Sequence, residues 1–421
     1  MKSGFEVIRQ KRRAGCIVNH KQCVTDRIRR PRASVQEGMH FVGALLLLVA
    51  VAAPAQPTSP YTPASDAAVL QKVPPASDPA MRRIAALRRA VAAKGSSAAD
   101  ADALARAYVD YGRKVGDAHY AGYAEAVIAP WMAKANPPPA VQVTQATILQ
   151  YRHEFAPART LLEQAVRTDP SLAQAWLSLA SLDMLEGDYT RAAERCARAG
   201  RHGGRAVGLA CSANVHLYTG DAARGLALLA QVDTPALAAW IDGLRAEACE
   251  RLGRWPEAEA HYRKALDAAP GDNYLLVGYA DFLLDRGRAK EVVALLTDYT
   301  ESDTTYLRLA LAHAAQKSPQ APMFRWTMAA RFEAYRQRES ELFGREEARF
   351  LLHLADDPEA ALVAAQRNFE RQREPADVRI LLEAARAARK PAAAAPAVAF
   401  VERVKLEDPA IETLVRDLRG A

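Results

Sequence analysis

The pair of residues most suited to chemistry is Cys196 and Cys211, in the segment CARAGRHGGRAVGLAC. The two cysteines stand at equal distances from the pair Gly203–Gly204. If two antiparallel helices are joined at the stretch RHGGR, both thiols face each other across neighbouring helices, within reach of a disulfide. The spacing therefore predicts a disulfide. Two small buried thiols remain the alternative, since free cysteine is among the most buried residue types.

Other chemistry finds little support in the sequence. A catalytic thiol needs a histidine base, and the nearest histidines, His202 and His216, belong to no motif. Zinc would require closely spaced ligand pairs, which are missing, as are the phosphate-loop, G-x-S-x-G and H-E-x-x-H motifs. We expect no catalytic residue, no metal site and no cofactor. Cys249 is expected to be a single buried thiol.

The charged segment FGREEARF, residues 343–350, could suggest acid–base chemistry. At helical spacing its arginines, Arg345 and Arg349, and its glutamates, Glu346 and Glu347, are expected to be exposed ion-pair partners.

The elements that position these residues are indicated by a repeat. Three turn-like stretches each precede an Ala-x-x-x-large pattern, and two weaker copies fall between and after them. The anchor positions 158, 192, 225, 258 and 292 are separated by 34, 33, 33 and 34 residues. Such a period is typical of stacked helix–turn–helix units. We find no strand-like alternation of any length, and the chain is predicted to be all-α.

These repeats resemble the tetratricopeptide repeat (TPR), a helix–turn–helix unit of 34 residues. The second unit reads AWLSLA, with Trp176 followed by Leu179 and Ala180 where the family has Leu-Gly. The resemblance implies a right-handed α-solenoid in which small residues let helices approach and glycine ends the first helix of each unit.

The pattern divides the chain into five parts. Residues 139–300 are the core TPR units, and 78–138 a capping helix with a degenerate repeat. Residues 301–421 are predicted to be degenerate TPR-like repeats. Residues 56–77, rich in Pro, Ser and Ala, are predicted to be a disordered linker. Residues 1–55 are an N-terminal extension with a signal peptide, and Met39 is an alternative start.

The signal peptide follows from the leader. An apolar stretch at 41–53 precedes Ala53-Pro54-Ala55, a small-x-small cleavage signal, so cleavage is expected after Ala55. Thirteen residues are too few to span a bilayer. Residues 1–38 hold ten basic and three acidic residues, which is the whole net charge of +7. Residues 56–421 hold 46 of each sign. We expect a periplasmic or secreted protein with no nucleic-acid partner and no membrane span in the mature chain.

The family resemblance implies a concave groove lined by the first helix of each unit. Carried over to this sequence, the groove positions run from a polar and aromatic half to an acidic half: Thr147, Gln150, Tyr151, Ser181, Met184, Asn214, Leu217, Tyr218, Glu247, Glu250, Arg251, Asp281 and Asp285. An acidic groove would receive a basic or N-terminal peptide segment. The alternative is that these residues form solvated helix faces without a ligand.

The sequence thus favours a non-enzymatic exported TPR scaffold that binds another envelope protein or peptide, similar to uncharacterised exported TPR proteins of proteobacteria. A scaffold subunit of a polysaccharide or outer-membrane export apparatus is a second interpretation. A small-ligand receptor or enzyme on the solenoid is a third.

Overall fold

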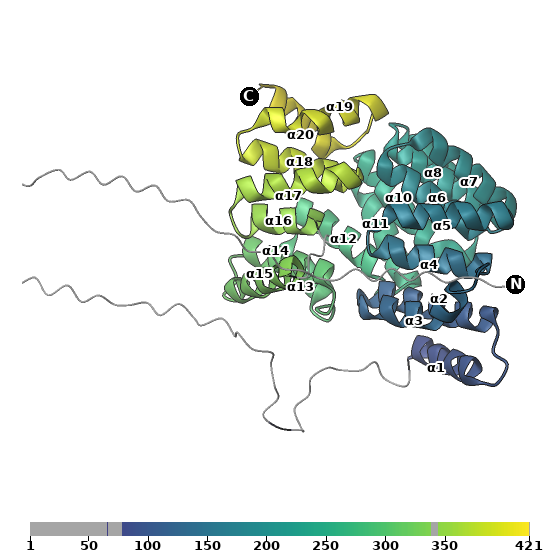
Figure 1. Cartoon of the computed structure of the whole chain (residues 1–421). Coiled ribbons are helices and arrows are strands. Elements are labelled where there is room, and N and C mark those ends of the chain that lie inside the picture. The colour runs from purple at the N-terminus through teal and green to yellow at the C-terminus, as the bar shows by residue number, and fades with distance from the viewer. Residues whose placement is uncertain (1–64, 66–77, 338–343, 421) are drawn as a thin grey trace, which may run out of the picture. The chain divides into compact units, whose positions relative to one another are not determined.

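A computed structural model describes residues 65, 78–337 and 344–420. The predicted signal peptide and nearly all of the predicted linker lie outside the described residues. The described residues from 78 onward form one compact unit. Every element in the described ranges is helical, without a strand, which confirms the all-α prediction (Figure 1).

The helices pair as A and B helices of successive repeats. The amino-terminal helices are α1 (Pro79–Ala92), α2 (Ala98–Val115) and α3 (His119–Met132). The core repeats are the five pairs α4 (Pro139–Tyr151) with α5 (Phe155–Thr168), α6 (Ala173–Glu186) with α7 (Tyr189–Gly203), α8 (Arg205–Tyr218) with α9 (Ala222–Leu229), α10 (Ala238–Arg251) with α11 (Trp255–Ala268), and α12 (Asn273–Asp285) with α13 (Ala289–Leu296).

The carboxyl-terminal helices continue the same alternation. They are α14 (Asp303–Ala315), α15 (Ala321–Gln337), α16 (Gly344–His353), α17 (Pro358–Arg371), α18 (Pro375–Ala387), α19 (Ala395–Val404) and α20 (Pro409–Gly420). Two short 3₁₀ helices, η1 (Pro235–Leu237) and η2 (Pro391–Ala394), precede α10 and α19.

Local sequence explains where many of these helices begin and end. The side chains of Asp188 and Asp272 accept backbone N–H groups of α7 and α12 at their first turns. Such N-caps satisfy amides that have no partner inside the helix. Gly187 follows α6 with φ 79° and Gly220 follows α8 with φ 67°, a left-handed conformation that favours glycine. We call the turn between the two helices of one repeat the A-to-B turn.

The carboxyl-terminal repeats contact the A-to-B turns of the core repeats. Two loops make these contacts, residues 372–374 between α17 and α18 and residues 405–408 between α19 and α20; we call them the closing loops. The amide of Arg373 donates to the carbonyl of Leu185 at 2.9 Å. The amide of Ala222 donates to the Glu407 carboxylate at 3.2 Å. In Figure 1, α5–α8 lie on one side and α16–α20 on the other, with α12 between them.

Glycines at the A-to-B turns permit this close approach. A Cβ placed on Gly187 would lie 2.6 Å from the Phe400 ring, and one on Gly220 would overlap the carbonyl oxygen of Lys405. One hydrophobic cluster accordingly contains Tyr189 of α7 together with Phe400 of α19. The solenoid therefore packs against itself, and its early and late repeats share a core.

Candidate functional site

The structure joins Cys196 and Cys211 in a disulfide, with Cα atoms 5.3 Å apart. The connection between the two helices is shorter than the expected RHGGR turn. Helix α7 continues to Gly203 and α8 begins at Arg205, so that Gly204 alone, at φ 97°, separates them.

The helices α7 and α8 meet closely beside this bond. A Cβ on Gly200 would lie 2.8 Å from the Cα of Gly208, so both positions need a residue without a side chain. This glycine pair lies between the two cysteines in sequence, and it could have been used to predict the close contact between the two helices. Cys249 is a buried free thiol, and burial raises its pKa to about 11, so it stays protonated.

In the polar half of the predicted groove, two of the side chains form hydrogen bonds with backbone carbonyls of their own helix. Thr147 Oγ1 donates to the carbonyl of Val143 at 2.9 Å, and Gln150 Nε2 donates to the carbonyl of Ala146 at 3.2 Å. Tyr151 is half-buried, and burial raises the pKa of its hydroxyl.

The middle of the predicted groove is mostly core. Met184, Leu217 and Tyr218 are buried in the cluster shared with the carboxyl-terminal repeats, so they are not open to a ligand. Ser181 is exposed. Asn214 is half-buried, and its Oδ1 has no hydrogen-bond partner among the described residues. The groove pattern of the family does not transfer to these three positions because their side chains are part of that core, and Leu217 packs against Gly225 of its own repeat.

The acidic half of the predicted groove receives arginines from the chain itself. Asp281 accepts Arg308 at 2.8 Å and Arg349 at 2.9 Å. Burial opposes the charge of Asp281, but the two guanidinium groups hold the pKa of its carboxyl well below the usual range. Asp285 accepts Arg379 through both carboxylate oxygens, at 2.6 and 2.7 Å. A basic segment was predicted for these acids, and arginines of α14, α16 and α18 fill that role.

Arg251 is held in the same way by a closing loop. Its Nη1 lies 3.5 Å from Asp408, and its side chain is 9% exposed. Its Nε has no hydrogen-bond partner among the described residues. The guanidinium also lies over the ring of Tyr218, at 5.5 Å from the ring centre.

Residues 344–350 form buried contacts, contrary to the prediction that the charged residues of segment 343–350 are exposed ion-pair partners. Glu346 is 6% exposed and pairs with the buried Arg308, while Arg345 lies 2.9 Å from Glu374. Glu347, by contrast, pairs with Arg336 at the surface. The expectation was wrong for Arg345, Glu346 and Arg349 because their shortest ion pairs are with residues far away in sequence, Glu374, Arg308 and Asp281, for which spacing along one helix carries no signal.

Glu247 and Glu250 complete the predicted acidic half, and neither forms an ion pair with a described residue within 4 Å. The Tyr274 hydroxyl donates to Glu247 at 2.6 Å. The Tyr262 hydroxyl donates to Glu250. Burial raises the pKa of Glu247 and raises that of Glu250 to about 7. Tyr274 is 66% exposed, so the Glu247–Tyr274 pair remains open to a ligand.

Models of the tetratricopeptide repeat match residues 143–205, 212–273 and 250–316. Residues 143–205 and 212–316 are therefore identified as tetratricopeptide repeats. The TPR prediction is thereby confirmed for the part of the chain where the repeat period is most regular. A search among curated proteins finds no match.

Solved structures similar to this chain include the human IFIT1 dimer with PPP-AAAA, at 12% identity and a TM-score of 0.47, over 77% of this chain and 76% of that one. They also include the yeast Tom70, at 11% identity and a TM-score of 0.42, over 81% of this chain and 85% of that one.

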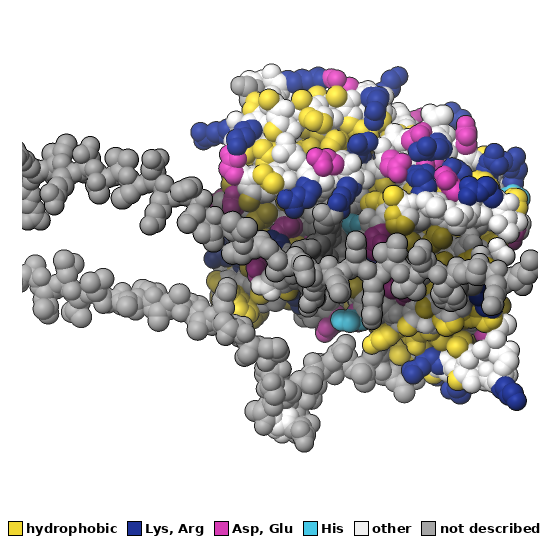
Figure 2. Space-filling model, viewed as in Figure 1, with side chains coloured by type: hydrophobic (Ala, Val, Ile, Leu, Met, Phe, Trp, Pro, Cys, Tyr) yellow, Lys and Arg dark blue, Asp and Glu magenta, His cyan; other side chains and the backbone are white. Residues whose placement is uncertain are grey.

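The distribution of charge and the lengths of the helices are relevant to nucleic-acid and membrane partners. On the face shown in Figure 2, lysine and arginine side chains are interspersed with aspartate and glutamate rather than gathered into one basic surface. Among the helices described, none is both long and apolar enough to cross a membrane. The repeats themselves are typical of protein–protein interaction.

Proposed function

We propose that this TPR chain is a non-enzymatic scaffold that binds a protein or peptide through the Glu247–Tyr274 pair on its A helices. The observation that carries the proposal is this pair. It combines a carboxylate without an ion-pair partner among the described residues and an aromatic ring that is 66% exposed.

The pair favours a partner with a lysine or arginine side chain. A cation beside Glu247 would offset the burial that raises the pKa of this carboxyl. The same cation could lie over the Tyr274 ring, where cation–π attraction adds about 0.5–1 kcal/mol at an exposed site. The neighbouring acids Asp281 and Asp285 are already neutralised by arginines of the chain, which leaves Glu247 and Glu250. Glu250 accepts the hydroxyl of the buried Tyr262, whereas Glu247 lies beside the exposed Tyr274, so Glu247 is the better placed of the two for a partner.

A cross-linking pull-down from intact cells, read by mass spectrometry, tests this proposal. The wild type and the control Glu257→Lys, which changes an exposed glutamate of α11, should capture one dominant protein. Glu247→Lys and Tyr274→Ala should lose it while keeping their helical circular dichroism and melting temperature. Unchanged capture by both variants would contradict the proposal.

The proposal also places the scaffold in the periplasm or outside the cell. Its supports are the apolar stretch at 41–53 with its cleavage signal, and the disulfide, because disulfides persist in oxidising compartments. Protein purified from the producing cells should begin at Gln56. A purified chain that retains residues 41–55 would contradict export by cleavage.

A further inference from the structure

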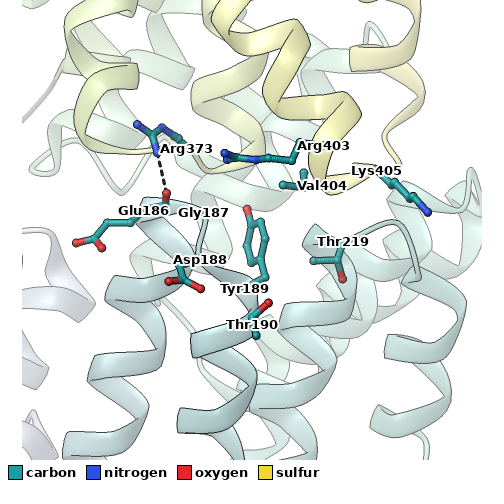
Figure 3. A pocket seen from close by; sticks show the side chains of 10 residues that line it. All are labelled: Glu186, Gly187, Asp188, Tyr189, Thr190, Thr219, Arg373, Arg403, Val404 and Lys405. Atoms are coloured by element: carbon teal, nitrogen blue, oxygen red, sulfur yellow. Dashed lines mark hydrogen bonds between the residues drawn. The ribbon is translucent and has the colours of Figure 1, made fainter.

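A cavity of about 570 Å³ lies where the closing contacts meet the core repeats. Its floor is the A-to-B turn from Glu186 to Thr190, together with Thr219 after α8. The wall opposite this floor is formed by Arg373 of the first closing loop and by residues 403–405, where α19 ends and the second closing loop begins (Figure 3). This volume is in the range of small-molecule sites, which is about 300–1,000 Å³. The cavity is separate from the Glu247–Tyr274 pair.

The acids of this cavity are already neutralised. Glu186 pairs with Arg159 at 2.9 Å and with Arg191 at 3.3 Å. Asp188 pairs with Arg191 at 3.3 Å, and its other oxygen caps the amino end of α7. The negative charges therefore have cationic partners outside the cavity lining.

The cations of the cavity have no such partner. Among the described residues, no carboxylate forms an ion pair with Arg373, Arg403 or Lys405. In Figure 3 the guanidinium groups of Arg373 and Arg403 lie on the same wall, and the ring of Tyr189 rises from the floor toward Arg403. The cavity thus carries an uncompensated positive charge on one side.

Both guanidinium groups are positioned without using all their donors. Arg373 Nη1 donates to the carbonyl of Glu186 at 2.8 Å, and its guanidinium lies 5.7 Å from the ring centre of Phe369. The guanidinium of Arg403 lies 5.3 Å from the ring centre of Phe400. Stacking on a ring face leaves the N–H edge of a guanidinium available for hydrogen bonds.

Hydroxyl groups add neutral donors opposite the arginines. Burial, more than any nearby charge, raises the pKa of Tyr189, so its hydroxyl keeps its proton. Thr190 contributes a second hydroxyl to the lining at the first turn of α7.

We propose that this cavity binds a phosphate group of a small molecule, held between Arg373, Arg403 and the Tyr189 hydroxyl. Phosphate suits the site because it offers several acceptor oxygens to two guanidinium groups and a hydroxyl at once. The ligand would bridge a closing loop and α19 to an A-to-B turn of the core repeats. Binding would therefore stabilise the closed arrangement by mass action.

The test is the binding of inorganic phosphate to the purified full chain, by calorimetry and by melting temperature at constant ionic strength. The wild type should show a saturable response. Arg403→Gln, which changes an exposed side chain, should weaken the apparent Kd about tenfold. Arg367→Gln, an exposed arginine of α17, is the matched control and should bind as the wild type does.

Three outcomes would overturn the proposal. They are no saturable response of the wild type, equal apparent Kd values for Arg367→Gln and Arg403→Gln, or binding of citrate in the same assay without binding of phosphate. The first two would exclude a phosphate site built on Arg403, and the third would assign the cavity to carboxylates instead. Any of these results leaves the partner proposal for Glu247 and Tyr274 untouched.

Discussion

The core repeats and the carboxyl-terminal repeats make the same kind of turn with different residues. In four of the five core repeats, after α6, α8, α10 and α12, the left-handed position is glycine, at 187, 220, 253 and 287, and after α4 it is His153 with φ 59°. After α14, α16 and α18 it is Lys317, Asp356 and Arg389, with φ between 50° and 56°. Left-handed backbone is strained for residues other than glycine, so the surrounding packing must hold these turns.

The two regions also present different charges to each other. Asp281 and Asp285 lie on one A helix of the core repeats. They form ion pairs with three arginines of the carboxyl-terminal repeats, Arg308, Arg349 and Arg379. The carboxyl-terminal repeats therefore do more than stack on their neighbours in sequence. They also cover A-to-B turns of the core repeats.

The largest effect is expected from the buried end of this charge pairing. Asp281→Asn should lower the free energy of unfolding by about 3 kcal/mol, because Arg308 stays buried without one of its two carboxylates. Denaturant unfolding measures the loss. Asp267→Asn, an exposed aspartate of α11, should change little. Equal stability of the two variants would mean that the pairing does not hold the regions together.

A smaller effect separates turn strain from closing contact. Gly220 and Gly287 share φ 67°, but a Cβ on Gly220 would overlap Lys405, whereas one on Gly287 meets nothing within 4 Å. Both Gly→Ala variants should lose about 1 kcal/mol from backbone strain. Gly220→Ala should lose roughly 1–3 kcal/mol more, from overpacking. Thermal or chemical unfolding of both variants measures this, and identical losses would argue against the contact.

The smallest effect is a pH dependence at Glu250. Its pKa is about 7 in the folded chain against an ordinary 4.5, because of burial. Between these values the folded chain holds a proton that the unfolded chain has released, so this group's stabilisation falls as pH rises through that window. Relative to Glu250→Gln, the wild type should lose about 1 kcal/mol, allowing for solvent screening.

Melting temperatures measured from pH 5 to 8 test this last expectation, with roughly half-unit steps giving enough points across the titration. Glu257→Gln, an exposed glutamate of α11, is the control and should run parallel to the wild type. A wild type that runs parallel to Glu250→Gln across the same pH range would contradict the raised pKa.

Local regularities allowed much of the fold to be predicted. The anchor spacing locates the B helices, because the anchor residue recurs with every repeat and is small, Ala or Gly, in four of the five. The two cysteines, at equal distances from Gly203–Gly204, likewise indicate the contact between α7 and α8. Beyond residue 300 the left-handed turns persist without glycine, so the sequence there marks the ends of the A helices less clearly.

The candidate site was less predictable. Gln372 contacts His153, and Glu407 contacts Ala222, at separations of 219 and 185 residues. Such contacts leave no period in the sequence. The groove positions carried from the repeat pattern assumed an open A-helix face, which is why Leu217 and Tyr218 were assigned to it although both are buried in the core. The acids were recognised, but the arginines that meet them are far away along the chain.

The most direct test of the closed arrangement is the hydrogen exchange of one amide. The Arg373 N–H lies between α17 and α18 and donates to Leu185, outside any helix ladder. In the full chain, NMR with labelled arginine should show this amide protected by roughly a hundredfold or more over an unstructured chain. An Arg373 amide that exchanges at the unprotected rate, while the amides of α18 remain protected, would show that the carboxyl-terminal repeats do not close on the core.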